Sequence, residues 1–244
     1  MCGDSVCMDS SDIRATYFDK VYREGHWGDI RSGPGSTVSS TIGIRLAVEE
    51  VFRKYAVKSM LDAPCGDLTW IPLVRGIDQV RYTGADISVS AVNENRRKVP
   101  PPRYDEQGQA VSTRAGGLQG AVFMQADLIE GVPPSVDGQP YDLIFVRDMM
   151  IHLAPRHNRR VLRNIEASGA RLLMATTYLD GDDNWGADTF VPAIGHFINL
   201  FLPPYCLRPP IALFSDVAMG RPDKRMGLWE LDPARSLVTS DGKC

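Results

Sequence analysis

The sequence predicts a three-layer α/β fold, with helices on both faces of a mostly parallel sheet. Short apolar segments alternate with segments of helical periodicity between residues 58 and 177. The predicted strand at residues 141–148 contains a continuous apolar run, Leu143-Ile144-Phe145-Val146, which is typical of a strand buried on both faces. Four predicted strands also end on a carboxylate: Asp62, Asp86, Asp127 and Asp148. Because parallel strands deliver their carboxyl ends to one edge of a sheet, these residues predict a shared ligand site.

Composition limits the classes of function. The chain has 244 residues, a net charge of −3 and a pI near 5.8, so we expect one domain over residues 1–244 and no nucleic-acid partner. No apolar run approaches the roughly 20 residues of a membrane helix, and residues 1–5 lack signal-peptide features. Five cysteines without paired spacing favour reduced thiols. We therefore expect a cytoplasmic protein without a membrane partner; its oligomeric state is not predicted.

Residues 11–56 are expected to form an N-terminal helical cap, or lid. Apolar residues at helical spacing predict a helix that begins at Ser11. A glycine-rich loop follows over residues 26–36, in which Trp27 is a candidate cover for a ligand. Residues 39–55 form the next predicted helix, and its core-facing residues are expected to be Ile42, Leu46, Val48, Val51 and Phe52.

Residues 57–177 are expected to form the ligand-binding core, and residues 178–244 a substrate-side helix and a terminal hairpin. The predicted strands are residues 58–63, 81–86, 121–127, 141–148, 171–177, 211–217 and 226–231. The predicted helices are residues 68–74, 88–98, 155–167 and 188–200. Residues 99–120, rich in Pro, Gly and Gln, predict a surface insertion. The sheet therefore has seven strands, mostly parallel, with the last one antiparallel.

The carboxylates at the strand ends limit the classes of ligand that the site can bind. Carboxylates accept hydrogen bonds from ribose hydroxyls, amino groups or an adenine amine, and they repel a phosphate. No phosphate-binding Gly-x-x-x-x-Gly-Lys-[Ser/Thr] motif is present. The turn after the first strand holds a single glycine, Gly66, whereas a pyrophosphate-binding fingerprint needs three. A ligand without phosphates fits these residues better.

Several ordered motifs resemble one known family. They are Trp27 followed by Ser32-Gly33-Pro34-Gly35-Ser36, then Asp62-Ala63-Pro64-Cys65-Gly66-Asp67, Arg147-Asp148-Met149-Met150-Ile151-His152-Leu153, Leu202-Pro203-Pro204-Tyr205-Cys206-Leu207 and Leu228-Trp229-Glu230-Leu231. The chain resembles the class I S-adenosylmethionine-dependent methyltransferases, in particular small bacterial-type enzymes. The resemblance implies a Rossmann-like fold. Pro64 departs from the family pattern, which has only small residues in this turn. Proline also removes a backbone donor there, so a different turn geometry is expected.

The resemblance also implies the cofactor, S-adenosylmethionine, its product, S-adenosylhomocysteine, and a set of roles. Asp62, Ala63 and Gly66 would hold the methionine part, with Asp62 towards its ammonium group. Asp86 would bind both ribose hydroxyls, with Ile87 against the adenine. Asp127 would accept a hydrogen bond from the adenine amine, beside Leu128. The remaining implied cofactor-binding residues are Trp27, Ser36 and Arg147, and Arg147 would line the junction of cofactor and substrate with Asp148.

The catalytic and substrate residues are less defined by the sequence. An amine or hydroxyl acceptor must lose a proton, for which a positioned Asp or His is suited. Asp148 and His152 are the candidates, although His152 also fits a packing or capping role. Tyr178, Asn184 and Trp185 follow the fifth strand and are candidate substrate contacts.

The leading hypothesis is methyl transfer to a small polar metabolite by in-line displacement, the acceptor lying beyond strands four and five. Two alternatives stay open. A nicotinamide-dependent oxidoreductase is disfavoured by the missing glycines. A non-catalytic S-adenosylmethionine-binding module is disfavoured by the intact Asp62, Asp86 and Asp127. No metal site is predicted, and neither the acceptor nor the atom methylated is identified.

Overall fold

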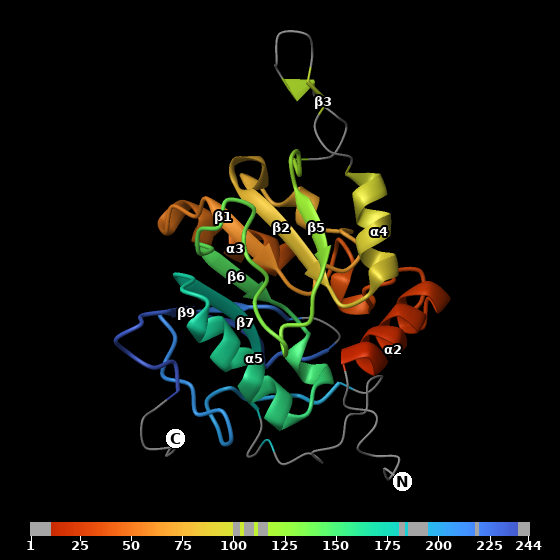
Figure 1. The fold of residues 1–244 in the computed structure, drawn as a ribbon. Helices are drawn as coiled ribbons and strands as arrows, with labels where there is room; N and C mark the ends of the chain where they lie inside the picture. The colour runs from red at the N-terminus through yellow and green to blue at the C-terminus, as the bar shows by residue number, and fades with distance from the viewer. Residues whose placement is uncertain are drawn as a thin grey trace.

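A seven-stranded sheet organises the computed structural model, which describes residues 11–99, 103–104, 110–111, 117–180, 184, 195–217 and 220–238 (Figure 1). The strand order is β5-β2-β1-β6-β7-β9-β8, and β9 is antiparallel to both of its neighbours. The strands are β1 (Ser59–Asp62), β2 (Arg81–Asp86), β5 (Val122–Gln125), β6 (Leu143–Val146), β7 (Leu172–Tyr178), β8 (Ala212–Ser215) and β9 (Lys224–Glu230). The predicted seven strands, parallel pairing and antiparallel last strand are confirmed.

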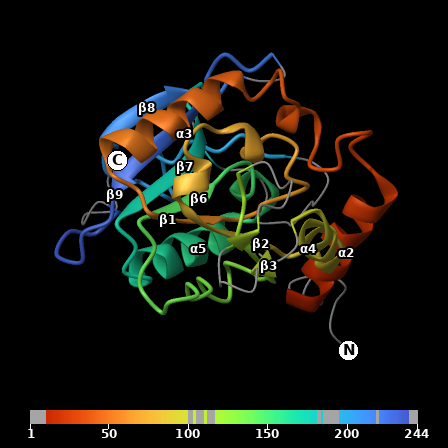
Figure 2. The ribbon, with the colours of Figure 1, turned by 90° about the horizontal axis from the view of Figure 1, so that it is seen from above.

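Helices cover both faces of this sheet. They are α2 (Ser11–Glu24), α3 (Ile42–Lys54), α4 (Val89–Lys98) and α5 (Pro155–Ala167), each close to a predicted helix. Figure 2 shows α3 and α5 on opposite sides of the sheet. Within the predicted insertion, β3 (Arg103–Tyr104) and β4 (Ala110–Val111) pair with each other in a separate ladder.

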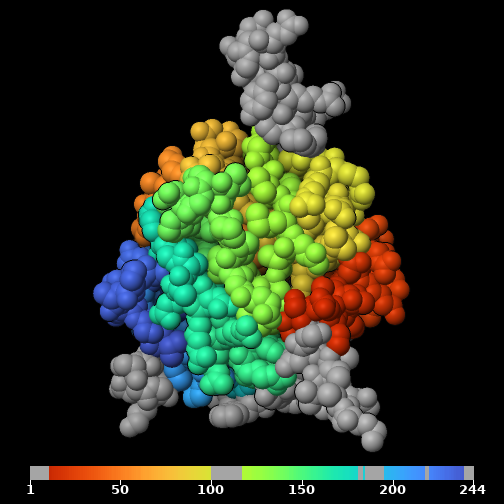
Figure 3. Space-filling view, viewed as in Figure 1, coloured from red at the N-terminus to blue at the C-terminus, as the bar shows by residue number. Residues whose placement is uncertain are grey.

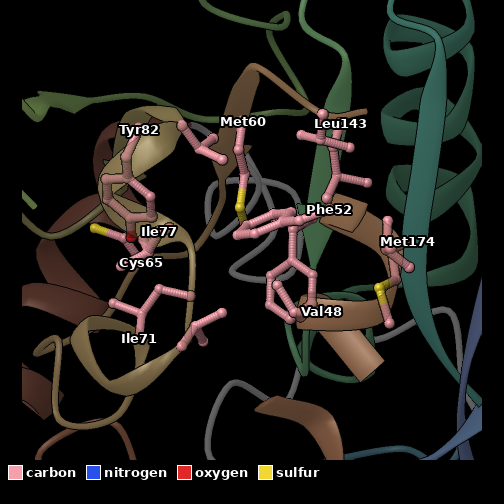
Figure 4. Close-up of a cluster of buried hydrophobic side chains, with 14 of the residues drawn as sticks. Val48, Phe52, Met60, Cys65, Ile71, Ile77, Tyr82, Leu143 and Met174 are labelled. Atoms are coloured by element: carbon pink, nitrogen blue, oxygen red, sulfur yellow. The ribbon is translucent and has the colours of Figure 1, made fainter. Parts of the chain in front are cut away.

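The strands send alternate side chains into two hydrophobic clusters, one on each face. Met60 and Phe145 belong to the cluster beneath α3, whereas their neighbours Leu61 and Val146 belong to the cluster beneath α5. Figure 4 shows Phe52 of α3 packed beside Met60 in the first cluster. Burial on both faces explains why the central strand β6 is apolar throughout. The carboxylates Asp62 and Asp86 lie at the ends of β1 and β2.

Helix α2 lies beside α4 at the carboxyl edge of the sheet, which Figure 3 shows as a red surface next to a yellow one. Asp19 of α2 joins the two helices: its Oδ1 accepts hydrogen bonds from Ser90 N at 2.7 Å and from Ser88 Oγ at 2.9 Å. A carboxylate is favourable there because the first turn of α4 presents unpaired N–H groups. Helix α3, in contrast, belongs to the layer that packs on the sheet.

The helix predicted at residues 68–74 is wrong. That stretch contains only a 3₁₀ turn, η2 (Ile71–Leu73), and a second one, η3 (Ile77–Gln79), precedes β2. Leu68 has a positive φ of 60°, and Asp67 Oδ1 accepts hydrogen bonds from both Thr69 N and Thr69 Oγ1. This local turn competes with helical hydrogen bonding. Within the described residues, no α-helix therefore lies between β1 and β2.

Two further expectations about helices are corrected. Residues 195–199 have no regular secondary structure and residue 200 lies in a turn, so this part of the predicted helix is wrong. Tyr178 N donates to Ile198 O, and Leu200 N donates to Thr177 Oγ1. Residues 188–194 lie outside the described residues. On α3, Ile42 and Leu46 are exposed, since the buried face follows Ile44, Ala47, Val48, Val51 and Phe52.

Cys206 is disulfide-bonded, which differs from the expected reduced thiols. Sequence spacing does not show which cysteines the fold brings within bonding distance. Cys65 is a free, buried thiol. Among the described residues, no helix combines the length and the apolar character needed to cross a bilayer.

Candidate active site

A cavity of about 510 Å³ opens at the carboxyl edge of the sheet, a size typical of small-molecule sites. Its walls come from α2, the loop that precedes α3, and the ends of β1, β2, β5, β6 and β7. It brings together most of the residues predicted from the sequence. These are Trp27, Ser36, Asp62, Ala63, Gly66, Asp86, Ile87, Asp127, Leu128, Arg147, Asp148, His152 and Tyr178.

The turn after β1 is fixed by the loop that precedes α3. Asp67 N donates to Ser32 Oγ at 2.7 Å, and Ser32 N donates to Asp67 Oδ2 at 3.3 Å. Gly66 lies between these bonds with a positive φ of 56°, and a Cβ there would overlap Ser32 Oγ. Glycine is required at this position both by backbone conformation and by close approach. The peptide bond between Ala63 and Pro64 is cis.

Gly66→Ala is expected to be more harmful than the same change at Gly76. Both glycines have positive φ, but a Cβ on Gly76 meets no atom within 4 Å. Gly76→Ala should lower the free energy of unfolding by about 1 kcal/mol through backbone strain alone. Gly66→Ala should lower it further and displace Ser32 from the cavity wall. Thermal unfolding of both variants tests this, and equal losses would contradict it.

Asp62, at the end of β1, is almost fully buried. Burial raises the pKa of its carboxyl to about 7; the hydrogen bond from Tyr82 Oη, at 2.6 Å, opposes this rise, and the nearby charge of Asp86 adds to it. Only Oδ2 is used by that bond. The other oxygen, Oδ1, is available to a ligand donor, and a cationic ligand group would favour the ionised form.

Asp86, at the end of β2, is held by two backbone groups. Its Oδ1 accepts a hydrogen bond from Ser88 N at 2.9 Å, and its Oδ2 accepts one from Gly66 N at 3.1 Å. Burial raises the pKa of Asp86 to about 6 even though these bonds lower it. A carboxylate accepts about four hydrogen bonds. One position on each oxygen is therefore left for a ligand with two adjacent hydroxyls.

Asp127 is paired with a residue that the sequence analysis missed, Arg14 of α2. Arg14 Nη2 lies 2.7 Å from Asp127 Oδ2, and the Arg14 side chain is 1% exposed. Ile129 N donates to the other oxygen, Oδ1, at 2.9 Å. The pair joins segments 113 residues apart, so no local pattern pointed to it. It ties the N-terminal helix to the wall of the cavity that contains Asp127.

The opposite end of the cavity contains a buried network of two cations and two anions. Arg147 donates from Nε and Nη2 to the two oxygens of Asp216, at 2.8 and 3.0 Å. Lys224 Nζ donates to Asp148 Oδ2 at 2.6 Å and lies 3.0 Å from Asp216 Oδ2. Arg147 and Asp148 follow β6, Asp216 follows β8, and Lys224 begins β9. Asp216 and Lys224 were also missed, because only the hairpin brings them beside Arg147.

Asp148 is held as a carboxylate within this network. Burial would raise its pKa, but Arg147 and Lys224 outweigh burial and lower it. Thr176 fixes the orientation of Asp148, since Asp148 N donates to Thr176 Oγ1 at 2.9 Å. Asp148 has a positive φ of 57°, an uncommon conformation that occurs at functional sites. Its side chain is 27% exposed and lines the cavity.

His152 lies in a 3₁₀ turn, η4 (Met150–His152), so it does not share a helix face with Asp148. Its ring stacks on Trp27, with centroids 5.8 Å apart, and meets Phe18 of α2 edge-on at 6.1 Å. His152 is one of the charges that lower the pKa of Asp148. The predicted loop over residues 26–36 thus places Trp27 on the cavity wall next to His152.

Tyr178, at the end of β7, and two side chains beyond that strand complete the wall. The guanidinium of Arg221 lies 3.9 Å from the ring centroid of Phe197 and 5.5 Å from that of Tyr178. The Tyr178 and Phe197 rings are 4.9 Å apart. Tyr178 was predicted, whereas Phe197 and Arg221 were missed. Phe197 lies in the stretch predicted as helix, and Arg221 in the turn of the hairpin.

Asn184 does not line the cavity. Its side-chain amide donates to the carbonyl oxygens of Asn199, Leu202 and Pro203, and its Oδ1 accepts from Asn199 N. All of these bonds fix the segment that follows residue 195. Trp185 lies outside the described residues.

Comparisons with solved structures identify the fold. The chain is similar to magnesium protoporphyrin IX methyltransferase from Synechocystis PCC 6803 with bound SAM, at 14% identity and a TM-score of 0.58 over 92% of this chain and 98% of that one. It is similar to the N-methyltransferase NodS from Bradyrhizobium japonicum WM9 in complex with S-adenosylhomocysteine, at 11% identity and a TM-score of 0.59 over 89% and 98%. A third similar structure is the mitomycin 7-O-methyltransferase MmcR, at 14% identity and a TM-score of 0.58 over 88% and 60%.

These likenesses, with the strand order and the antiparallel β9, show the class I S-adenosylmethionine-dependent methyltransferase fold, which is Rossmann-like. Neither the protein-family models nor the curated proteins give a match to the sequence. The similar structures include both an N- and an O-methyltransferase. The fold alone therefore does not define the methyl acceptor.

Proposed function

We propose that this protein transfers a methyl group from S-adenosylmethionine to a small molecule. The observation that carries the proposal is a single cavity that joins two buried carboxylates, Asp62 and Asp86, to the charged network around Asp148. The first pair suits a ligand with an ammonium group and two hydroxyls. The network around Asp148 offers fixed polar groups to a second molecule in the same cavity.

The residues present fit S-adenosylmethionine. Each of Asp62 and Asp86 keeps hydrogen-bonding capacity towards the cavity, and neither would face a phosphate. We assign Asp62, Ala63 and Gly66 to the methionine part and Asp86 to the ribose. Ile87, Asp127 and Leu128 are assigned to the adenine; Asp127 Oδ1 still has a free acceptor position beside its bond from Ile129. Trp27, Ser36 and Arg147 complete the proposed cofactor wall.

When bound, the cofactor supplies a methyl group activated by a sulfonium. The protein then has to place a nucleophile in line with that group and exclude water. Trp27 and the α2 side chain Phe18 provide an apolar cover. The low pKa of Asp148 suits it to orient an acceptor N–H or O–H and to stabilise positive charge. His152, whose imidazole lines the cavity beside Trp27, is the other candidate proton acceptor.

Replacing Asp148 or His152 should lower methyl transfer far more than cofactor affinity. We expect Asp148→Asn and His152→Gln to slow transfer by about 10²-fold, the lower range for a positioned acid–base group. The dissociation constant for S-adenosylhomocysteine should stay within about threefold, which corresponds to less than 1 kcal/mol. Transfer of labelled methyl groups and calorimetry measure the two quantities. Unchanged transfer in either variant removes that residue from the catalytic assignment.

The function itself is tested by comparing cofactors. Calorimetry with S-adenosylhomocysteine and with NADH should show saturable binding of the first alone. Labelled S-adenosylmethionine should then transfer its methyl group to a compound in a pool of small metabolites. Binding of NADH alone would support an oxidoreductase instead. Binding of S-adenosylhomocysteine without transfer to any acceptor would favour a non-catalytic module.

A further inference from the structure

The charges that line the cavity are unevenly distributed between its two ends. The carboxylates of Asp62, Asp86 and Asp127 lie at the ends of β1, β2 and β5. The cations at the other end follow β6 or belong to the β8–β9 hairpin: Arg147, Arg221 and Lys224. On that side, Asp148 is the one carboxylate among the described lining residues. The cofactor end also contains Asp67 and the cations Arg14 and Arg31, so its carboxylates outnumber its cations, whereas at the acceptor end the lining cations outnumber the lining carboxylates.

The anions that neutralise these cations lie behind the wall. The side chain of Asp216, which pairs with Arg147 and Lys224, is 0% exposed. The side chain of Asp223, which pairs with Arg221, is 2% exposed, whereas that of Arg221 is 31% exposed. Neither aspartate lines the cavity. The ion pairs thus hold the cations in place, and the carboxylates of Asp216 and Asp223 stay behind the surface that a ligand would meet.

Two of these cations keep donors for a ligand. Arg221 donates to Asp223 from Nε at 2.9 Å and from Nη2 at 2.7 Å, which leaves its Nη1 group for another acceptor. Lys224 Nζ has three hydrogens, and its carboxylate contacts within the described residues are Asp148 and Asp216. One hydrogen is left. Because burial and pairing already order these side chains, little rotamer entropy is lost when a ligand binds.

An exposed aromatic surface lies beside the cations. Phe197 is 52% exposed although it lines the cavity, and its ring packs on Tyr178 at 4.9 Å. The Arg221 guanidinium covers part of the Phe197 ring at 3.9 Å. A large exposed apolar side chain within a cavity is a surface that a ligand can cover. A flat ring in the ligand matches this wall.

We infer that the methyl acceptor is an aromatic acid, whose carboxylate binds Arg221 and Lys224 and whose ring packs on Phe197. The inference rests on the proposed function, because it defines the acceptor of that reaction. An amine of the same shape is disfavoured, since it would meet Arg147, Arg221 and Lys224. Asp148, the carboxylate that faces the cavity there, is already paired with Lys224 at 2.6 Å.

The test titrates the protein, saturated with S-adenosylhomocysteine, with aromatic acids and their matched neutral and cationic forms. The probes are benzoate, 2-naphthoate and indole-3-acetate, each with its amide and its methylene amine. Calorimetry at millimolar ligand should show that at least one acid binds at least about tenfold more tightly than its amide, the effect of one charged hydrogen bond. The corresponding amine should not bind measurably.

Arg221→Gln should weaken binding of that acid by about tenfold and leave its amide unaffected. Arg235→Gln, at an exposed position that does not line the cavity, serves as the matched control and should bind the acid as the wild type does. Absence of acid binding, or tighter binding of the amine, overturns the inference. Binding of S-adenosylhomocysteine is measured first, so its failure would refute the proposed function rather than the acceptor class.

Discussion

Asp86→Ala is expected to lower the affinity for S-adenosylhomocysteine by about 10²–10⁴-fold, because two hydroxyls lose a charged hydrogen-bond acceptor worth about 1.5–3 kcal/mol each. The carboxylate is pre-positioned for this role by bonds from Gly66 N and Ser88 N. Its burial means that water does not replace the lost acceptor well. Calorimetric titration of the folded variant measures the loss.

A matched variant separates this loss from general destabilisation. Asp142 also accepts two backbone hydrogen bonds, from Lys58 N at 2.7 Å and from Ser59 N at 3.1 Å. It lies at the amino edge of the sheet and does not line the cavity. Asp142→Ala should therefore destabilise the fold while it keeps wild-type affinity. If Asp86→Ala also binds S-adenosylhomocysteine with unchanged affinity, the ribose assignment fails.

Cofactor affinity should fall steeply as the pH is lowered from about 8 to 5. Burial raises the pKa of Asp62 to about 7 and that of Asp86 to about 6 in the ligand-free protein. The ammonium group and the ribose hydroxyls favour the ionised carboxylates. Below the pKa of Asp62, protonation should reduce affinity by up to tenfold per pH unit, and Asp86 steepens the fall below about pH 6. Calorimetry across this range measures the profile.

Tyr82→Phe provides a directional control for the pH profile. The Tyr82 hydroxyl donates to Asp62 Oδ2 at 2.6 Å and so opposes the rise in the pKa of Asp62. Its removal should raise that pKa further and shift the affinity profile towards alkaline pH. An affinity that does not depend on pH in the wild type, or a shift of the variant profile towards acid, would contradict the assignment of Asp62.

The same pKa values give the sign of the stability change without ligand. Both carboxyls bind protons more tightly in the folded state than in the unfolded state, where an aspartate titrates near 3.9. Their ionisation therefore opposes folding. This contribution is absent below about pH 4 and grows as the pH rises through the folded pKa values of about 6 and 7. Bound cofactor should offset the loss at neutral pH.

The sequence predicts the sheet and the strand-end carboxylates because both depend on local patterns. The apolar run that becomes β6 is buried on both faces, and each predicted strand lies within a few residues of an observed one. Strands β5, β2, β1 and β6 are neighbours in the sheet and run parallel. One cavity therefore contains the carboxylates that follow them: Asp62, Asp86, Asp127 and Asp148. The apolar pattern of each strand and the position of the carboxylate at its end were sufficient to predict that part of the site.

The failures have a different physical origin. The helix predicted after β1 is replaced by a turn that Asp67 and a positive φ at Leu68 stabilise, and this turn chemistry outweighs apolar spacing. Arg14 and Lys224 were missed because each meets its carboxylate partner across a long sequence separation. Asn184 has a polar side chain of the kind that contacts substrates, but in the fold its amide bonds to the segment that contains Asn199.

A crystal structure of the complex with S-adenosylhomocysteine tests the central claim most directly. We predict that the ribose hydroxyls bond to Asp86, that the adenine lies between Ile87 and Leu128, and that the sulfur faces Asp148. The acceptor side, bounded by Tyr178 and Arg221, should stay open to a second molecule. Density for the ligand outside this cavity, or a sulfur turned away from Asp148, would contradict the proposed methyltransferase site.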